Sequence, residues 1–187
     1  MKEALDVLTQ WSTKWRLKIN GTKSKFLVFT KRFPRLTDQL HIQNNPIPFS
    51  NTVKYLGITL DSRLTFRQHI GNVRTEAFKR YMALYPLFKS PATKSVKTLL
   101  YKSYIRSYML YCCEVWASAH SRHLRRLDGI QRAICRTITG AHYLTTNAQL
   151  YRELQLPLFS EHILQLRATY QKSLQRHPNL LLHNLTS

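Results

Sequence analysis

Apolar residues near the N-terminus recur at intervals of three and four, which is the spacing along one side of an α-helix. The residues of this stripe are Leu5, Leu8, Trp11 and Trp15. They predict a helix over residues 3–18. Asn20-Gly21 is expected to end this helix, because glycine readily takes the left-handed conformation that follows many helices.

Short segments with a different pattern follow and predict antiparallel strands. Residues 25–30 (KFLVFT) are aromatic and β-branched, which is typical of a strand. Residues 39–43 alternate between apolar and polar side chains, and residues 47–49 are expected to return beside them as a hairpin. The strongest strand pattern covers residues 53–60 (VKYLGITL), in which Gly57 indicates a bulge or a close approach of another backbone.

From residue 65 onward only helical periods occur. We expect helices, the first of them ending before Pro86, over residues 66–84, 91–119, 121–139, 146–154 and 160–175. The 121–139 helix has a regular inward stripe, formed by Leu124, Leu127, Ile130, Ile134 and Ile138, and Gly140 ends it. The sequence therefore predicts an α+β fold, with a helix and a small antiparallel sheet over residues 1–62 and an all-α helical bundle over residues 63–187.

Basic residues dominate the charge of the chain. Lys and Arg number 29 against 9 Asp and Glu, which gives a formal net charge of +20. A chain this basic repels itself unless an anionic partner screens the charge. Nucleic acid or an acidic membrane surface is therefore the expected partner.

Composition also excludes several classes of protein. No apolar run reaches the roughly 18 residues of a membrane helix, and the N-terminus lacks the pattern of a signal peptide. The 3 cysteines do not make a disulfide framework, so we expect a reducing compartment, either nucleus or cytoplasm. The carboxylates are scattered, whereas a two-metal phosphoryl-transfer site needs them clustered. No catalytic residue, metal ligand or cofactor is therefore predicted within this chain.

An ordered set of segments gives the chain a family resemblance. The segments are WSTKWRLKINGTKSKFLVF, VKYLGITLDSRLTFRQHI, KTLLYKSYIRSYMLYCCEVW and LRRLDGIQRAICRTITG. In this order and at this spacing they resemble the C-terminal part of a reverse transcriptase from a non-LTR retrotransposon of the LINE or jockey type. The resemblance covers residues 5–166, and Trp11–Lys23 and Val53–Ile70 are its most specific parts.

The resemblance implies a role for each part of the chain. Residues 11–29 match the last helix and strand of the polymerase palm, and residues 53–60 match the primer-grip hairpin. The helices after Leu64 match the thumb, which follows the template–primer duplex. The family's Asp-Asp motif, which holds Mg²⁺ in the full-length enzyme, would lie just before the first helix. The resemblance thus implies a polymerase fragment that binds an RNA/DNA primer–template without containing those aspartates, and that is inactive alone.

Two groups of residues are predicted to contact nucleic acid within this framework. On the 53–60 strand, Lys54 and Tyr55 would touch primer phosphate and sugar, and Gly57 would let the backbone come close. The second group is formed by cations of the predicted helices: Arg67, Arg74, Lys79, Arg80, Lys97, Lys102 and Arg106. Further arginines, which extend this basic surface, occur in the 121–139 helix: Arg122, Arg125, Arg126, Arg132 and Arg136. Acidic residues are scarce among them, so phosphate is an expected partner.

Most of these features also have a plainer interpretation. The 53–60 segment fits an ordinary half-buried strand, and basic helices commonly present a solvated face. Asp61 is expected to turn the chain rather than to act as a catalytic acid. The cysteines are expected to be buried free thiols rather than zinc ligands, because the adjacent Cys112 and Cys113 would point apart on a helix. One aromatic stripe is expected to form core rather than to stack on bases: Tyr101, Tyr104, Tyr108, Tyr111 and Trp116.

The sequence leaves three functions open. The chain is a fragment of a reverse transcriptase, a non-enzymatic nucleic-acid-binding module, or a basic helical domain that binds a protein or an anionic membrane. The resemblance favours the first, with an RNA/DNA primer–template as partner and no membrane. In a fragment, apolar surface around Trp11, Trp15 and Phe26 would lack its neighbours, so self-association is also expected.

Overall fold

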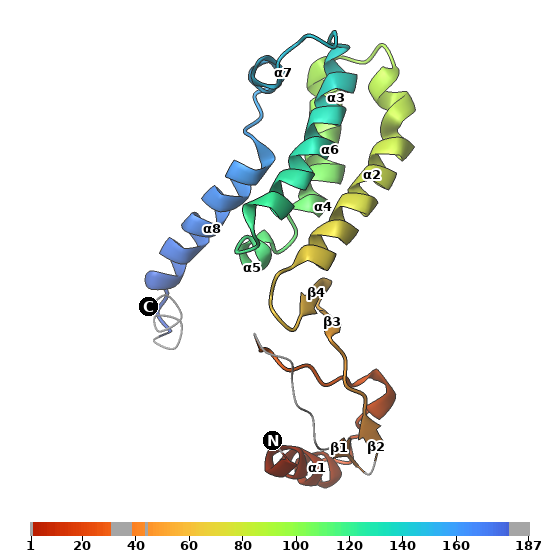
Figure 1. Ribbon diagram of the computed structural model, residues 1–187, viewed down its shortest axis with the longest axis vertical. Coiled ribbons are helices and arrows are strands. Elements are labelled where there is room, and N and C mark those ends of the chain that lie inside the picture. The colour runs from red at the N-terminus through yellow and green to blue at the C-terminus, as the bar shows by residue number, and fades with distance from the viewer. Residues whose placement is uncertain (1, 31–38, 44, 180–187) are drawn as a thin grey trace. The chain divides into compact units, whose positions relative to one another are not determined.

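The chain forms two compact units, residues 1–64 and 65–187 (Figure 1). The computed structural model describes residues 2–30, 39–43 and 45–179. The first unit contains one helix and short strands, and the second contains helices throughout its described part. The predicted α+β class is confirmed. The identity of the two units as the end of a palm and a thumb stays a prediction.

The first unit is built from one α-helix, a short 3-10 turn and two separate hairpins. Its elements are α1 (Lys2–Lys14), η1 (Gly21–Lys23), β1 (Leu40–Ile42), β2 (Asn45–Ile47), β3 (Thr52–Tyr55) and β4 (Ile58–Asp61). β1 pairs antiparallel with β2, and β3 pairs antiparallel with β4, so the strands form two small sheets.

The β1–β2 hairpin forms the small core of this unit. Leu40 lies opposite Ile47, and both are buried together with Ile42. Three partly buried side chains pack against this cluster: Leu5 from α1, Ile19 and Phe26. The predicted hairpin is present, and the alternating apolar residues of its first strand are the ones that are buried. Its return strand was placed too late, because it covers Asn45–Ile47 rather than residues 47–49.

The end of α1 was predicted at the wrong place. The helix stops at Lys14, because Arg16 takes a left-handed conformation (φ 55°) and the Leu17 N–H donates to the Ser12 carbonyl at 2.8 Å. Asn20 instead caps the 3-10 turn, where its Oδ1 accepts from the Lys23 N–H at 3.1 Å. Position 21 needs glycine because the Asn45 side chain lies close to its backbone. A Cβ at this position would lie 2.9 Å from the Asn45 Cβ.

Two strand predictions are also wrong. Residues 25–30 form no strand and make only one isolated bridge, between Phe26 and Phe49. Residues 53–60 are not one strand with a bulge but two strands, β3 and β4, joined by a two-residue turn at Leu56-Gly57. Both turn residues have positive φ, 45° and 84°, which is the conformation that the right-handed twist of a hairpin favours. Gly57 takes this conformation without steric cost.

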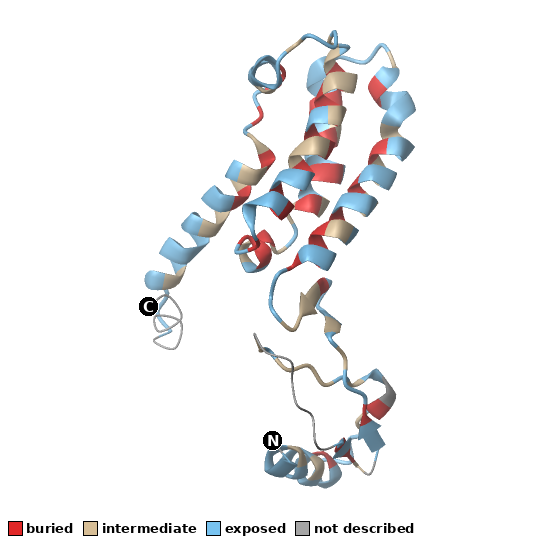
Figure 2. Cartoon of the chain, in the orientation of Figure 1, coloured by how far each residue is buried: buried red, intermediate tan, exposed pale blue. Residues whose placement is uncertain are grey.

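The second unit is a helical bundle. Its elements are α2 (Arg67–Lys89), α3 (Lys94–Leu100), a π-helical turn η2 (Tyr101–Arg106), α4 (Ser107–Met109), α5 (Cys113–Trp116), α6 (Ser121–Thr139), α7 (Asn147–Glu153) and α8 (Phe159–Gln175). α2 packs against α6, and α8 packs against α5 and α6 (Figure 1). Buried residues follow the inward sides of these helices, whereas the second half of α8 is mostly exposed (Figure 2).

A buried glutamine ties the centre of the bundle together. Gln131 of α6 is fully buried, and its Oε1 accepts from the Tyr101 hydroxyl at 2.8 Å. Its amide nitrogen donates to the carbonyl of Pro157 at 2.8 Å. One side chain thereby joins η2, α6 and the segment that leads into α8, and its hydrogen bonds remove the cost of burying a polar group.

One helix prediction is confirmed in detail, and two others differ from the structure at their ends or interior. α6 is confirmed with its inward stripe buried and with Gly140 in the left-handed conformation after it (φ 65°). α2 continues through Pro86, because Phe88 is buried in the final turn and stacks on Tyr81 at 6.2 Å. The predicted 91–119 helix is broken by a turn at Cys112, whose φ is 48°.

Candidate nucleic-acid interface

The turn of the β3–β4 hairpin presents an exposed polar and aromatic surface, which we call the hairpin tip (residues 54–57). The Tyr55 side chain is 63% exposed, Leu56 is 72% exposed, and Lys54 is also exposed. The hairpin tip contains Lys54, Tyr55 and Gly57 of the predicted contacts, with Gly57 at the turn rather than inside a strand.

Two of the predicted cations lie on one exposed side of α2. Arg67 and Arg74 are seven residues apart, so they occupy the same side of the helix, two turns from each other. Both are exposed. Lys79 is exposed as well, but it pairs with Glu76 at 3.6 Å. An exposed pair of this kind contributes little to stability and does not prevent Lys79 from meeting phosphate.

α6 also carries exposed arginines. Arg122, Arg125, Arg126 and Arg132 are exposed on the side of α6 that lies opposite its buried stripe. Arg136 differs, because its guanidinium donates to the carbonyls of His142 and Thr145 at 3.1 and 2.7 Å and so holds the loop after the helix.

The positive charges of three arginines from the two helices act on His123 of α6. The pKa of His123 is lowered first by burial and further by the positive charges of Arg122, Arg67 and Arg126. Arg67 of α2 and the two arginines of α6 therefore act on the same imidazole. We call Arg67, Arg74, Arg122 and Arg126 the arginine face. No salt bridge within the described part of the chain neutralises these four guanidinium groups.

The acidic residues of these helices are engaged elsewhere. Asp128 Oδ1 accepts from the Ser160 N–H at 2.8 Å, at the start of α8, where a negative charge also stabilises the helix dipole. Glu76 faces Lys79 and Arg80. The positive potential of the arginine face is therefore available to an external anion.

Three predicted contact residues are turned into the fold instead. Lys97 is buried, and its ammonium group donates to the Ser90 carbonyl at 2.6 Å. Arg80 donates to the Tyr104 carbonyl at 3.1 Å, and its guanidinium lies over the Tyr108 ring at 4.0 Å. Arg106 is only 7% exposed. Because Lys97 and Arg80 bond to nearby backbone carbonyls and Arg106 is buried, an interface with nucleic acid is best built from the remaining, exposed cations.

Arg106 is unusual because it is a buried charge without compensating acid. Its Nε and Nη2 atoms have no hydrogen-bond partner among the described residues. Burial lowers the pKa of its guanidinium, while nearby Tyr101 and Cys135 act in the opposite direction. A buried cation in this position costs stability.

The aromatic stripe is only partly core. Tyr101 and Trp116 are fully buried, as expected, whereas Tyr104 is 46% and Tyr111 is 54% exposed. The break at Cys112 explains the exposure of Tyr111, because the stripe loses its helical phase there. The carbonyl of Tyr111 accepts from the Trp116 indole N–H at 3.1 Å, which turns the tryptophan inward.

The remaining candidate groups have structural roles. Cys113 and Cys135 are buried free thiols, and burial raises the pKa of each to about 12, so neither is a thiolate at neutral pH. Asp61 turns the chain, since its Oδ1 accepts from the Arg63 N–H at 3.1 Å. In the described ranges no three His, Cys, Asp or Glu side chains gather as a metal site would require.

The exposure of the N-terminal helix agrees with the expected apolar surface. Trp11 and Trp15 of this region are 51% and 62% exposed. Self-association through this surface stays a prediction.

A pocket between α3 and the end of α7 was not predicted from the sequence. No local pattern indicates that segments more than fifty residues apart come together.

The chain has an α+β fold with a strongly basic composition, and comparison with known proteins gives its family. The chain is related over nearly all of its length to RNA-directed DNA polymerases of non-LTR retrotransposons, as its motifs predicted. It is 33% identical over 175 residues, 92% of the chain, to the "Probable RNA-directed DNA polymerase from transposon X-element" of Drosophila melanogaster. It is 29% identical over 99% of the chain to the "RNA-directed DNA polymerase from mobile element jockey" of the same species. It is 30% identical over 99% of the chain to the corresponding probable polymerase from transposon BS.

The chain spans about a fifth of the length of these relatives: 19%, 20% and 21%, respectively. No family model matches the sequence, and no solved structure matches the fold. Among the helices described here, none has the length and apolar character needed to cross a bilayer.

Proposed function

We propose that this chain is the primer–template-binding part of an RNA-directed DNA polymerase from a non-LTR retrotransposon, and that the aspartates which hold the catalytic Mg²⁺ lie outside it. The relatives are polymerases by their names, and each is about five times as long as this chain. Within this proposal the chain contributes binding and positioning of an RNA/DNA duplex but no catalytic group.

The observation that carries the proposal is the arginine face. Four exposed guanidinium groups lie on adjacent helices, and the nearby carboxylates are engaged with other partners. A phosphate backbone offers regularly spaced negative charges to such a surface, and each contact releases condensed counterions. Contacts of this type fix the position of a duplex without reading its sequence, as a polymerase requires of a surface that must follow any template.

The arginine face is tested by neutralising its α2 part. In the variant Arg67→Gln/Arg74→Gln, the affinity for an RNA/DNA primer–template is expected to fall about tenfold near 0.1 M salt, because two phosphate contacts are lost. The slope of log affinity against log salt is expected to decrease by about two. Fluorescence anisotropy of a labelled hybrid, titrated at several salt concentrations, measures both quantities.

A charge-matched control separates a defined surface from general attraction to a basic chain. Lys172→Gln/Arg176→Gln removes two exposed charges at the end of α8 and should change affinity less than the α2 variant. Duplex DNA and anionic lipid vesicles serve as alternative partners. Equal losses in both double variants, or equal binding to all three polyanions, would contradict the proposal.

The hairpin tip gives a second, independent prediction. Replacing Tyr55 with alanine removes an exposed ring that nothing in the described core requires, so stability should change by less than about 0.5 kcal/mol. Affinity for the primer–template is expected to fall several-fold if the ring packs on sugar or base. Anisotropy and thermal unfolding of the same preparation distinguish the two effects. An unchanged affinity would remove the hairpin tip from the proposed interface.

A further inference from the structure

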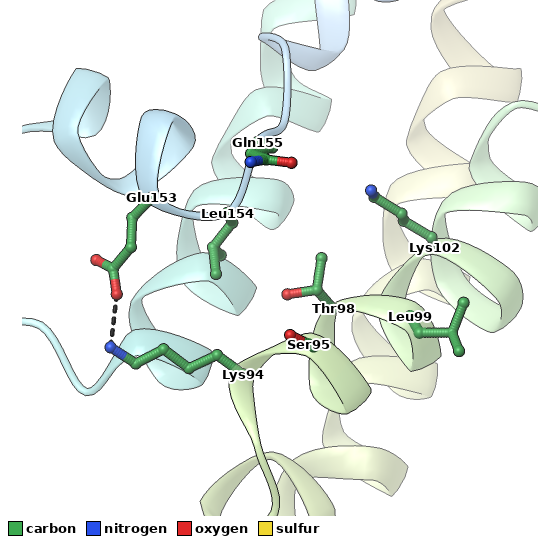
Figure 3. A pocket seen from close by; sticks show the side chains of 8 residues that line it. All are labelled: Lys94, Ser95, Thr98, Leu99, Lys102, Glu153, Leu154 and Gln155. Atoms are coloured by element: carbon green, nitrogen blue, oxygen red, sulfur yellow. Dashed lines mark hydrogen bonds and ion pairs between the residues drawn. The ribbon is translucent and has the colours of Figure 1, made fainter.

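A pocket of about 390 Å³ lies between α3 and the chain that leaves α7 (Figure 3). α3 and η2 contribute Lys94, Ser95, Thr98, Leu99 and Lys102, and the other wall is formed by Glu153, Leu154 and Gln155. Its volume falls within the range of small-molecule sites and exceeds what a single ion requires. The pocket is distinct from the arginine face, which belongs to α2 and α6.

Several hydrogen-bonding groups of this pocket are unused. The hydroxyls of Ser95 and Thr98 and the side-chain amide of Gln155 make no hydrogen bond to another residue in the described part of the chain. Thr98 is only 8% exposed, so its hydroxyl has limited access to water. Figure 3 shows Gln155 and Lys102 on opposite sides of the opening, with Thr98 below them. A ligand with both donors and acceptors would satisfy these groups.

The charges of the pocket favour an anionic ligand. Lys94 is neutralised by Glu153, with 2.6 Å between Nζ and Oε1, and this pair also fastens α3 to α7. Lys102, in contrast, has no ion pair in the described structure. The pocket therefore combines one free cation with neutral hydrogen-bonding groups and the apolar side chain of Leu154, which points toward α3 (Figure 3).

The backbone of Gln155 takes a left-handed conformation where the chain leaves α7. Its φ is 51°, and it follows the last turn of α7, where the Leu156 N–H donates to the Tyr151 carbonyl at 2.9 Å. This is the position after a helix that glycine normally occupies, because other residues are strained there. Strained residues of this kind often belong to ligand sites. The turn places Gln155 at the edge of the pocket, directly after α7.

We propose that this pocket binds a single unpaired nucleotide of the nucleic acid that the chain holds. This site depends on the proposed function, because the nucleic acid that the chain binds would supply the nucleotide. The Gln155 amide and the Thr98 hydroxyl would bond the base, Leu154 would contact its apolar surface, and Lys102 would pair with the phosphate. Hydrogen bonds to the exposed edges of unpaired bases are a common way in which proteins recognise single strands.

The pocket is tested with isolated nucleotides and the full chain. Uridine and adenosine 5′-monophosphates, the corresponding nucleosides and inorganic phosphate are titrated separately, and amide chemical shifts are followed by NMR. The monophosphates are expected to shift the resonances of Thr98, Lys102 and Gln155. Nucleosides should bind more weakly, and inorganic phosphate should not shift Gln155.

Gln155→Gly is a decisive variant, because it removes the amide and relieves the backbone strain together. Its melting temperature is expected to be unchanged or higher, while its affinity for the monophosphates falls about tenfold. Lys102→Gln should cause a similar loss, and Lys172→Gln, which removes the same charge from α8, should cause none.

Two outcomes would overturn the nucleotide site: unchanged affinity in Gln155→Gly, or equal shifts with inorganic phosphate alone. Either outcome is independent of the proposed function, which is judged by hybrid binding of the Arg67→Gln/Arg74→Gln variant. If that variant binds the hybrid more weakly but nucleotides do not bind at the pocket, the primer–template proposal stands. Only the nucleotide site is then excluded.

Discussion

Replacing Trp116 with alanine is expected to destabilise the helical unit by about 3–5 kcal/mol, a large part of the stability of a domain of this size. Trp116 is the largest fully buried side chain among the described residues. Its indole N–H donates to the Tyr111 carbonyl at 3.1 Å, and its ring meets His69 of α2 edge-on with 5.7 Å between centroids. The substitution leaves a cavity between α2 and the short helix α5 and removes the hydrogen bond to the Tyr111 carbonyl.

The neighbouring residue provides the control for this experiment. Val115 precedes Trp116 in α5 but is 50% exposed, so Val115→Ala should change stability by less than about 0.5 kcal/mol. Trp116→Phe keeps most of the apolar volume and should lose less than Trp116→Ala. Chemical unfolding followed by circular dichroism measures all three variants. Similar losses for Val115→Ala and Trp116→Ala would contradict the assigned core position of the indole.

Replacing Arg106 with methionine is expected to stabilise the chain by about 1–3 kcal/mol, contrary to the usual effect of a core substitution. The guanidinium is buried with Nε and Nη2 unpartnered among the described residues, and burial lowers its pKa. Methionine has a similar length, fills irregular space well and needs no hydrogen bonds. The free energy of unfolding, obtained from denaturant titration, is the measurement.

The same variant separates a structural Arg106 from one that contacts nucleic acid. Because the guanidinium is buried, Arg106→Met should bind the primer–template as the unmodified chain does, apart from the loss of one long-range charge. Arg125→Met, at an exposed position of α6, should leave stability within about 0.5 kcal/mol. A destabilised Arg106→Met variant, or one with affinity reduced as strongly as in Arg67→Gln/Arg74→Gln, would show that Arg106 has a partner that the described structure lacks.

The fold was predictable from the sequence where a local pattern and the tertiary packing agree. α6 is the clearest case, because its apolar stripe recurs regularly and Gly140 supplies the left-handed residue that ends it. The β1–β2 hairpin is another, since alternating apolar residues of one strand face the core. The family was predictable for a related reason, because the similarity to its relatives extends over 92–99% of the chain.

The candidate site was only partly predictable. Sequence composition indicates many cations in the helical part, and Arg67 and Arg74 are exposed as a binding role requires. Composition does not distinguish Arg67 and Arg74 from Lys97 and Arg106. The latter two are also cations, but they lie on the inward sides of α3 and η2. The pocket was not predictable, because Thr98 and Gln155 come together only when α7 folds back toward α3.

The sequence by itself determined the basic charge, the α+β class, most helix positions and the family, since each depends on composition or on neighbours in the chain. The tertiary structure alone decided which cations face solvent, where helices break and which polar groups meet. α2 extends through Pro86 because Phe88 is buried, and the chain turns at Cys112, which lets Trp116 reach the core. In these places the free energy of burying large apolar side chains exceeds the local backbone preference, and that free energy depends on residues distant in the sequence.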